Sequence, residues 1–221
     1  MLPLNVLIAC EESQTECSVF LAAGCNAYSC DLQECSGHYP SRHIVGDVRS
    51  LFVPGSFVQT QDGFPLCVPR WDLIIAHPPC TYLSKVAGPL LFPNHKLNEE
   101  RFIKGQEAAH FFFEMLNAPA RFVAVENPVP FKLFKLPPPS CAINPYDFGD
   151  PWSKQTLLWL SNLPPLFRTL ENPCYRSWHD CTRGGKKRSK SFPGIAKAMA
   201  DQWLPFILQT LNINPGHEIL Q

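Results

Sequence analysis

Short unbroken runs of apolar residues alternate along the chain with longer segments in which apolar residues recur at helical spacing. Unbroken runs are typical of strands buried on both faces, as in a parallel sheet. The pattern predicts strands at residues 5–9, 26–32, 43–51, 71–76 and 121–128. Because parallel strands need crossover connections, we expect an α/β fold with a doubly wound, mostly parallel, Rossmann-like sheet.

Helical spacing predicts helices at residues 15–24, 98–117 and 193–211. Gly24 suits a helix C-terminus, Asn98 can accept a backbone hydrogen bond as an N-cap, and Pro205 is expected to break the third helix. A further strand is expected at 155–163, and loops rich in proline and glycine are expected at 52–70 and 85–98.

Composition narrows the setting of the protein. The 221 residues include 19 basic and 19 acidic side chains, so the formal net charge is 0 and any nucleic-acid-binding surface must be local. The 10 cysteines include no Cys-x-x-Cys pair, and no apolar run is long enough for a signal peptide or a membrane span. These features predict a cytoplasmic protein with free thiols.

Polar and reactive residues follow each of the five parallel strands. Because the carboxyl ends of such strands share one edge of a doubly wound sheet, these residues are expected to meet in one crevice, where such folds bind ligands. They are Cys10-Glu11-Glu12-Ser13, Asp31, Asp47, His77-Pro78-Pro79-Cys80 and Glu126-Asn127-Pro128. Core packing alone would not leave polar groups at all five ends, so this edge is the predicted site.

Asp31 and Asp47 are placed to hold a nucleoside. At the ends of the second and third strands, they could accept hydrogen bonds from ribose hydroxyls and from an adenine amino group. Either could instead cap a helix or lie in a solvated loop. The loop ACEESQT after the first strand lacks G-x-G-x-x-G, and Glu11 and Glu12 would repel a pyrophosphate. This pattern argues against NAD and favours a cofactor whose loop-facing end is uncharged or cationic.

Cys80 and Glu126 form a candidate reacting pair. Pro78 and Pro79 fix the backbone before the Cys80 thiol, which suits a positioned nucleophile. Glu126, at the end of the next strand, could protonate or hydrogen-bond a ring nitrogen of the same substrate. Taken alone, Cys80 has a structural explanation, but the adjoining Glu-Asn-Pro strand end favours the nucleophile.

Several motifs together resemble those of DNA cytosine-5 methyltransferases, and the resemblance covers most of the chain. DLIIAHPPCTYLS resembles their Pro-Cys motif, VAVENP their Glu-Asn motif, GDVRSL their acidic cofactor motif, and FPGIAKAMADQW their last motif, whose helix returns to the cofactor pocket. ACEESQ and RSKSFPGIAKAMA are similar to the short phage or prophage members of this group.

The resemblance implies an S-adenosylmethionine-dependent methyltransferase fold and methyl transfer to carbon 5 of cytosine in DNA, with the cytosine flipped from the duplex. It also implies a bacterial cell or a phage-infected host, and no metal. Cys80 would add to carbon 6 and Glu126 would hold ring nitrogen 3; the catalytic set is Cys80, Glu126, Pro79 and Asn127. S-adenosylmethionine, or a modified sulfonium analogue, would be bound by Cys10, Glu11, Glu12, Ser13, Asp31, Leu32, Asp47, Val48, Pro78 and Ala196.

The chain departs from the family at several points. ACEESQ replaces the glycine-rich loop, Lys154 and Gln155 match the Gln-x-Arg-x-Arg motif only faintly, and a sizeable target-recognition domain is missing. We expect residues 1–163 and 191–221 to form the catalytic domain, and residues 164–190 a short basic insert in place of the recognition domain.

The insert combines basic and aromatic residues, which is typical of a phosphate-binding patch, although a solvated basic loop is the alternative. Its predicted nucleic-acid-binding residues are Arg183, Lys186, Lys187, Arg188 and Lys190. Cys174, His179 and Cys181, with a fourth group such as Cys141, could instead hold zinc.

Two other functions stay open. An amino-methyltransferase would carry Pro-Pro before an aromatic residue, but His77 and Cys80 occupy the positions of the usual Asp or Asn and of the aromatic. A non-catalytic nucleic-acid-binding or regulatory protein on the same fold would explain the missing glycine loop and arginines. The target sequence and oligomeric state are not indicated, and RNA or free nucleotides stay open as acceptors.

Overall fold

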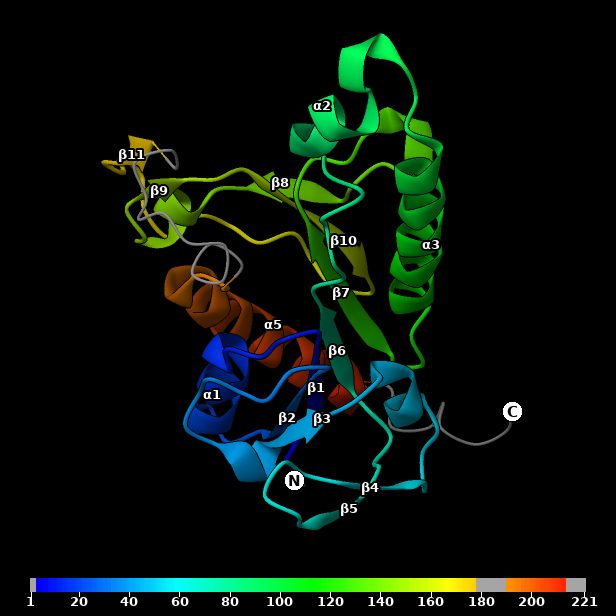
Figure 1. Ribbon diagram of the computed structural model, residues 1–221. Helices are drawn as coiled ribbons and strands as arrows, with labels where there is room; N and C mark the ends of the chain where they lie inside the picture. The colour runs from blue at the N-terminus through cyan, green and yellow to red at the C-terminus, as the bar shows by residue number, and fades with distance from the viewer. Residues whose placement is uncertain (1–2, 178–189, 214–221) are drawn as a thin grey trace.

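The computed structural model describes residues 3–177 and 190–213, which are built around a seven-stranded sheet (Figure 1). Across the sheet the strands are β3 (His43–Val45), β2 (Asn26–Asp31), β1 (Asn5–Ala9), β6 (Leu73–Ala76), β7 (Phe122–Asn127), β10 (Thr156–Ser161) and β8 (Cys141–Ile143).

Five of these strands are parallel neighbours. β3, β2, β1, β6 and β7 run in the same direction, whereas β10 is antiparallel to β7 and β8 is antiparallel to β10. The chain builds outward from β1 to β3 and then returns to place β6 on the other side of β1. The order therefore reverses between β1 and β6, and the predicted doubly wound, mostly parallel sheet is confirmed.

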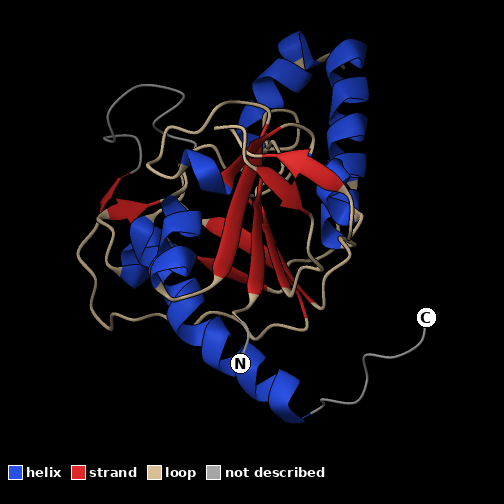
Figure 2. Ribbon diagram, turned by 90° about the horizontal axis from the view of Figure 1, so that it is seen from below, coloured by secondary structure: helices blue, strands red, loops and turns tan. Residues whose placement is uncertain are grey.

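Helices cover both faces of the sheet (Figures 1 and 2). They are α1 (Thr15–Ala22) and α5 (Pro193–Ile213) on one face and α3 (Glu99–Leu116) on the other. Alternate side chains of β1 point to opposite faces, so Val6 and Ile8 enter the core beneath α1 and α5, whereas Leu7 and Ala9 enter the core beneath α3. All four are fully buried, which explains why this strand is an unbroken apolar run.

The predicted ends of the first two helices are confirmed. Ala23 caps α1, and Gly24 follows with a φ of 85°, a left-handed conformation that favours glycine. At the start of α3, the Asn98 side-chain oxygen accepts the N–H of Arg101 at 3.0 Å. The C-terminus of α1 and the N-terminus of α3 therefore lie where the local backbone conformation or a side chain satisfies free peptide groups.

The expected break at Pro205 is wrong, because α5 continues through it to Ile213. Trp203 and Ile207, on either side of the proline, are fully buried in the core shared with α1. Burial of these large side chains offsets the backbone hydrogen bond that the proline removes.

The third strand is shorter than predicted. β3 ends at Val45, and residues Val48–Phe52 form a 3₁₀ helix instead of extending it. The Asp47 carboxylate accepts the N–H of Arg49 at 3.0 Å and so caps this helix. A local side-chain cap competes with strand pairing here, and apolar content alone did not reveal it.

The segments predicted as loops contain short elements. A hairpin of β4 (Phe57–Gln59) and β5 (Pro65–Cys67) turns near Gly63, whose φ is 86°. The second loop segment contains α2 (Gly88–Leu91), and outside both segments lies the short parallel pair β9 (Trp152–Ser153) and β11 (Arg176–Ser177). These elements are too short to show a hydrophobic period. Within residues 3–177 and 190–213, no helix has the length and apolar character needed to cross a membrane.

Candidate active site

The carboxyl ends of the parallel strands meet at one edge of the sheet, as predicted. Beyond β6, the His77 N–H donates to the Ala9 carbonyl oxygen at the end of β1 (2.9 Å). Beyond β1, the Glu11 N–H donates to the Cys30 carbonyl oxygen near the end of β2 (3.1 Å). These bonds fix the connecting segments at the point where the strand order reverses, which is where such folds bind ligands.

The Pro-Pro-Cys turn is attached to the end of β7. Nδ2 of Asn127 donates to the Pro78 carbonyl oxygen at 2.9 Å. Past the prolines, the N–H groups of Leu83 and Ser84 donate to the Cys80 carbonyl oxygen at 3.1 and 2.9 Å. Pro78 is buried, Pro79 is exposed and the Cys80 side chain is half-buried. The thiol and the end of β7 therefore belong to one hydrogen-bonded unit.

His77 lies between two carboxylates. Its Nε2 is 2.8 Å from Oε2 of Glu16, and its Nδ1 is 3.1 Å from Oε2 of Glu126. The Glu16 side chain is 1% exposed, and those of His77 and Glu126 are 14% and 23% exposed. Since a carboxylate only accepts, both ring nitrogens donate when both carboxylates are ionised, which requires the imidazolium form.

The charges of these groups reinforce one another. Burial alone would lower the pKa of His77, but the charge of Glu16 and the hydrogen bonds to Glu126 and Glu16 raise the pKa well above its usual value. For Glu126, burial alone would raise the pKa. The hydrogen bond and charge of His77, together with Thr156 and Lys154, instead hold the pKa of Glu126 below its usual range. His77 and Glu126 therefore form an ionised pair at neutral pH.

Glu126 is also held from β10 and closes a small pocket. Its Oε1 accepts a hydrogen bond from the Thr156 hydroxyl. Just before β10, Nζ of Lys154 lies 5.4 Å from the centre of the Phe192 ring. The pocket is lined by Glu16, His77, Glu126, Lys154, Thr156, Lys190, Ser191, Phe192, Ile195 and Met199. Its volume of about 30 Å³ is too small for a base ring. The first turns of α5 form one wall.

Cys80 is held mainly as the neutral thiol. Burial and the neighbouring Glu126 charge raise its pKa, whereas Lys154 and a backbone hydrogen bond act in the opposite direction. The thiolate is the reactive form of cysteine, so an approaching substrate or a base must promote loss of the proton.

The loop after β1 directs Glu11 at the start of α1. Its Oε1 accepts the Glu16 N–H at 2.7 Å, and its Oε2 accepts the Cys17 N–H at 3.2 Å. Burial and the charge of Glu16 raise the pKa of Glu11 to about 7, against the opposing effect of these hydrogen bonds and of His77. Both carboxylate oxygens of Glu11 thus accept backbone N–H groups of α1. A contact of this carboxylate with a cofactor stays a prediction.

Glu12 is in a different situation from Glu11. It is 9% exposed, and within the described part of the chain neither of its carboxylate oxygens has a hydrogen-bond partner. Its backbone carbonyl accepts the Ser36 N–H at 2.8 Å, and the neighbouring Ser13 hydroxyl lies 3.0 Å from that of Thr15. A buried carboxylate without partners is costly unless a cation or donor approaches it.

The remaining predicted cofactor residues differ in availability. Oδ1 of Asp31 accepts the Gln33 N–H at 2.9 Å, and the adjacent Leu32 is 77% exposed. Asp47 is held by Arg49, whose hydrogen bonds lower the pKa of Asp47, so its contact with an adenine stays a prediction. Four of the predicted residues offer their backbone or packing surface rather than a charged group: Cys10, Val48, Pro78 and Ala196.

The basic insert is described only at its ends. Nζ of Lys190 donates to the Ser36 hydroxyl at 2.9 Å. The other predicted phosphate-binding residues lie outside the described residues: Arg183, Lys186, Lys187 and Arg188. So do His179 and Cys181 of the zinc alternative, and no group of three metal-binding side chains occurs within the described part. The nine cysteines described are all free thiols.

Sequence reasoning missed the roles of Glu16 and Thr156, and it placed His77 at the predicted edge without giving it a role in the reaction. A histidine directly after a fully apolar strand was the available signal, since it had to be buried near a partner. Glu16 resembled an ordinary acidic residue in the first turn of a helix. Its pairing with His77, 61 residues away, depends on how α1 folds back over the sheet.

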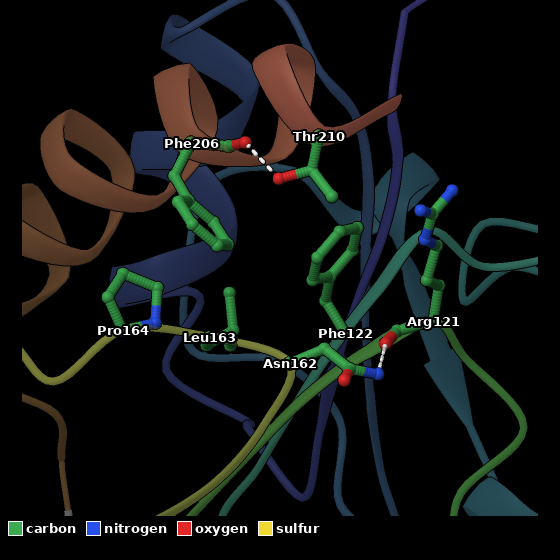
Figure 3. A pocket seen from close by; sticks show the side chains of 7 residues that line it. All are labelled: Arg121, Phe122, Asn162, Leu163, Pro164, Phe206 and Thr210. Carbon is green, nitrogen blue, oxygen red and sulfur yellow. Dashed lines mark hydrogen bonds between the residues drawn. The ribbon is translucent and has the colours of Figure 1, made fainter. Parts of the chain in front are cut away.

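A larger pocket lies at the opposite edge of the sheet, where β7 begins and β10 ends (Figure 3). It has a volume of about 470 Å³ and is walled by Phe122 and Phe206. Two hydrogen bonds join its lining: Nδ2 of Asn162 donates to the Arg121 carbonyl oxygen, and the Thr210 hydroxyl donates to the Phe206 carbonyl oxygen, both at 2.8 Å. Because it lies at this opposite edge, the pocket is separate from the reactive strand ends.

No protein-family model and no curated protein matches the chain. Similar solved structures include a protein described as a DNA modification methyltransferase encoded within an E. coli prophage, with 14% identity and a TM-score of 0.42, covering 78% of this chain and 53% of that one. The bifunctional kinase-methyltransferase WbdD has 14% identity and a TM-score of 0.36, covering 77% of this chain and 37% of its own. The chain spans about half the length of the prophage protein. Function is therefore inferred from the geometry of the site.

Proposed function

We propose that the protein is an S-adenosylmethionine-dependent methyltransferase that modifies carbon 5 of cytosine in DNA through a covalent adduct with Cys80. The observation that carries this proposal is the Asn127–Pro78 hydrogen bond of 2.9 Å, which holds the Cys80 turn against the strand that carries Glu126. A thiol or a carboxylate alone has a structural explanation. Fixed together, they supply the nucleophile and the ring-nitrogen partner that a pyrimidine carbon needs.

The reaction follows from the electronic structure of cytosine. Carbon 5 is a poor nucleophile until carbon 6 is saturated. The Cys80 thiol gives its proton to solvent water, and the thiolate forms a bond to carbon 6. The ring electrons shift toward nitrogen 3, which takes up a proton on the side where Glu126 would hold it. Carbon 5 then accepts the methyl group. Loss of its proton to solvent water restores the ring double bond and expels the thiolate.

The proposed attack on carbon 6 also requires a displaced base. Attack on carbon 6 comes from above the ring plane, which stacking blocks inside a duplex. The pocket of about 30 Å³ does not hold a base ring, so the ring would lie outside it, between Cys80 and the exposed side of Glu126.

The cofactor loop fits a ligand with a cationic end. The unpartnered carboxylate of Glu12 would receive the ammonium group of S-adenosylmethionine, whereas a nucleotide phosphate would be repelled. Asp31 would accept from the ribose hydroxyls, beside the exposed Leu32. Asp47 would reach the adenine amino group by sharing its carboxylate with Arg49. When bound, the cofactor supplies an electrophilic methyl group.

DNA binding would come from the basic insert. Its lysines and arginines would contact phosphates and release counterions, in a chain whose formal net charge is 0. Lys190 lines the small pocket and contacts Ser36, and we expect it to bind a phosphate that flanks the flipped base.

Covalent trapping tests the proposal. Duplex DNA containing 5-fluorocytosine is incubated with the protein and S-adenosylmethionine, because fluorine at carbon 5 prevents release of the adduct. The protein is expected to form an adduct that survives denaturing electrophoresis and maps to Cys80 by mass spectrometry. The Cys80→Ser variant is expected to form none, and Cys67→Ser, which alters an exposed thiol of the hairpin, is expected to match the unaltered protein.

The other outcomes separate the alternatives. Absence of an adduct while calorimetry shows bound cofactor would contradict the proposal. DNA binding without cofactor binding would favour the non-catalytic alternative. Methylation that persists in Cys80→Ser would indicate an amino-methyltransferase, which nucleoside mass spectrometry would distinguish by the position of the methyl group.

A further inference from the structure

The buried chain from Glu16 through His77 to Glu126 is more than the thiol-and-carboxylate reaction needs. Glu16 comes from α1, His77 follows β6 and Glu126 ends β7, so three separate elements place these groups in contact. Burying charged groups costs free energy even when they are paired, and replacing such groups by apolar ones is often neutral or stabilising. These three hydrogen-bonded side chains include the proposed active-site carboxylate, and we therefore expect them to take part in the reaction.

The proposed reaction needs a proton at ring nitrogen 3, and Glu126 alone does not hold one. Its oxygens accept hydrogen bonds from His77 and Thr156, which favour the ionised carboxylate. The neighbouring Nδ1 of His77, 3.1 Å from Oε2 of Glu126, does carry a proton when the ring is an imidazolium. Each carboxylate oxygen has two lone pairs, so Glu126 can keep both contacts and still receive the base.

We propose that His77 is a positioning residue that stores this proton: the imidazolium passes it through Glu126 to ring nitrogen 3 of the target base, and Glu16 stabilises the imidazolium beforehand. This inference rests on the proposed function and describes how the same site activates its base.

The proton that reaches nitrogen 3 is supplied and taken back within the protein, whereas the Cys80 thiol proton and the carbon 5 proton leave to solvent water. As the bond from sulfur to carbon 6 forms, negative charge develops on nitrogen 3. The Nδ1 proton moves to Glu126 and a proton moves from Glu126 to nitrogen 3, so Glu126 ends ionised, as it began. His77 becomes neutral and keeps its Nε2–H donated to Glu16. When the carbon 5 proton has left and sulfur is expelled, nitrogen 3 returns its proton by the same path.

Charged groups from each neighbouring element set the conditions for this relay. Glu16 of α1 and Glu126 of β7 contact the ring. The Glu11 carboxylate accepts the Glu16 N–H, and Lys154 and Lys190 line the same pocket. Burial and the charge of Glu16 raise the pKa of Glu11 to about 7. Ionisation of Glu11 near neutral pH therefore adds negative charge near the imidazolium and strengthens its hold on the proton.

The relay is tested by comparing two trapping substrates across a range of pH. Nitrogen at position 5 makes carbon 6 of 5-azacytosine more electrophilic, so thiolate addition to it depends less on protonation of nitrogen 3 than addition to 5-fluorocytosine. For His77→Gln we expect adduct formation to fall by about 100-fold or more with 5-fluorocytosine, the range of general acid catalysis, and by about 10-fold or less with 5-azacytosine. In the unaltered protein the rate should decline at alkaline pH as His77 loses the stored proton, and in His77→Gln this decline should disappear.

Two further variants complete the design. His43→Gln replaces another buried histidine, bonded to Ser29 and to the Gln33 carbonyl oxygen, and should leave both rates and the pH profile unchanged. Glu16→Gln keeps the size of the side chain and leaves His77 and Glu126 in place. It should lower the 5-fluorocytosine rate by less than His77→Gln does and move the alkaline decline to lower pH, because it removes a charge that holds the proton.

The outcomes separate this inference from the proposed function. Equal losses with both substrates in His77→Gln, or an unmoved pH profile in Glu16→Gln, would show a structural ion pair and overturn the relay while Cys80 chemistry stands. Rates that match the unaltered protein would overturn it as well. Failure of the unaltered protein to form an adduct with either substrate would instead overturn the proposed function.

Discussion

Asn127 donates its Nδ2 hydrogen to the Pro78 carbonyl oxygen across 2.9 Å, and this bond joins the two strand ends that carry the proposed nucleophile and its carboxylate. Asn127 is 1% exposed, and its Oδ1 has no partner among the described residues. The side chain therefore depends on this bond for its position, and the Cys80 turn depends on it for its attachment to β7.

Asn127→Asp tests that attachment with almost no change in volume. The new carboxylate faces the Pro78 carbonyl oxygen, so an attractive contact becomes a repulsive one. We expect the free energy of unfolding to fall by roughly 1–3 kcal/mol and adduct formation at Cys80 to slow. The matched control is Asn117→Asp, because exposed Asn117 makes the same kind of bond to the Phe113 carbonyl oxygen at 2.7 Å. Urea denaturation showing equal losses in both variants would contradict a special role for Asn127.

The reactivity of the Cys80 thiol provides a second test. Burial and Glu126 raise its pKa and Lys154 lowers it, so alkylation by iodoacetamide should become fast only at a more alkaline pH than for an ordinary thiol. Lys154→Met should slow alkylation several-fold at neutral pH, and Glu126→Gln should accelerate it. Peptide mass spectrometry follows Cys80 directly, and Lys197→Met, at a lysine 71% exposed on α5, should change nothing. Faster alkylation in Lys154→Met would show that the electrostatic assignment is wrong.

The sheet and its reactive edge could be predicted because both follow from short-range patterns. β1 and β6 are unbroken apolar runs, and parallel pairing then forces their carboxyl ends to one side. β8 and the β4–β5 hairpin have three residues per strand and show no period. The pairing of Glu16 with His77 was out of reach for another reason: it depends on where α1 comes to rest over the sheet, which no local pattern specifies.

Glu11 makes stability depend on pH. Its pKa rises from 4.5 to about 7 in the folded protein, so the folded state binds this proton more tightly than the unfolded state. The contribution is complete below about pH 4.5 and is lost as the pH rises through about 7. The advantage in unfolding free energy over Glu11→Gln should therefore shrink by roughly 2–3 kcal/mol across this interval.

The control for Glu11 is Glu99→Gln, at an exposed acid in the first turn of α3. Urea denaturation of the unaltered protein and of the two variants between pH 4.5 and 7 supplies the comparison. A difference between the unaltered protein and Glu11→Gln that stays constant over this interval would contradict the raised pKa.

Glu12 links folding cost to cofactor binding. Its buried carboxylate has no hydrogen-bond partner among the described residues, so it should destabilise the free protein and be relieved by a cationic ligand. Glu12→Gln removes the charge and keeps the shape. We expect the unfolding free energy of the free protein to rise by roughly 1 kcal/mol, while the affinity for S-adenosylmethionine, measured by calorimetry, falls by about tenfold or more. Ordinary damage to the fold would lower both the free energy of unfolding and the affinity for the cofactor. Opposite changes would therefore indicate that the Glu12 carboxylate binds a cation, and a loss of both would exclude that role.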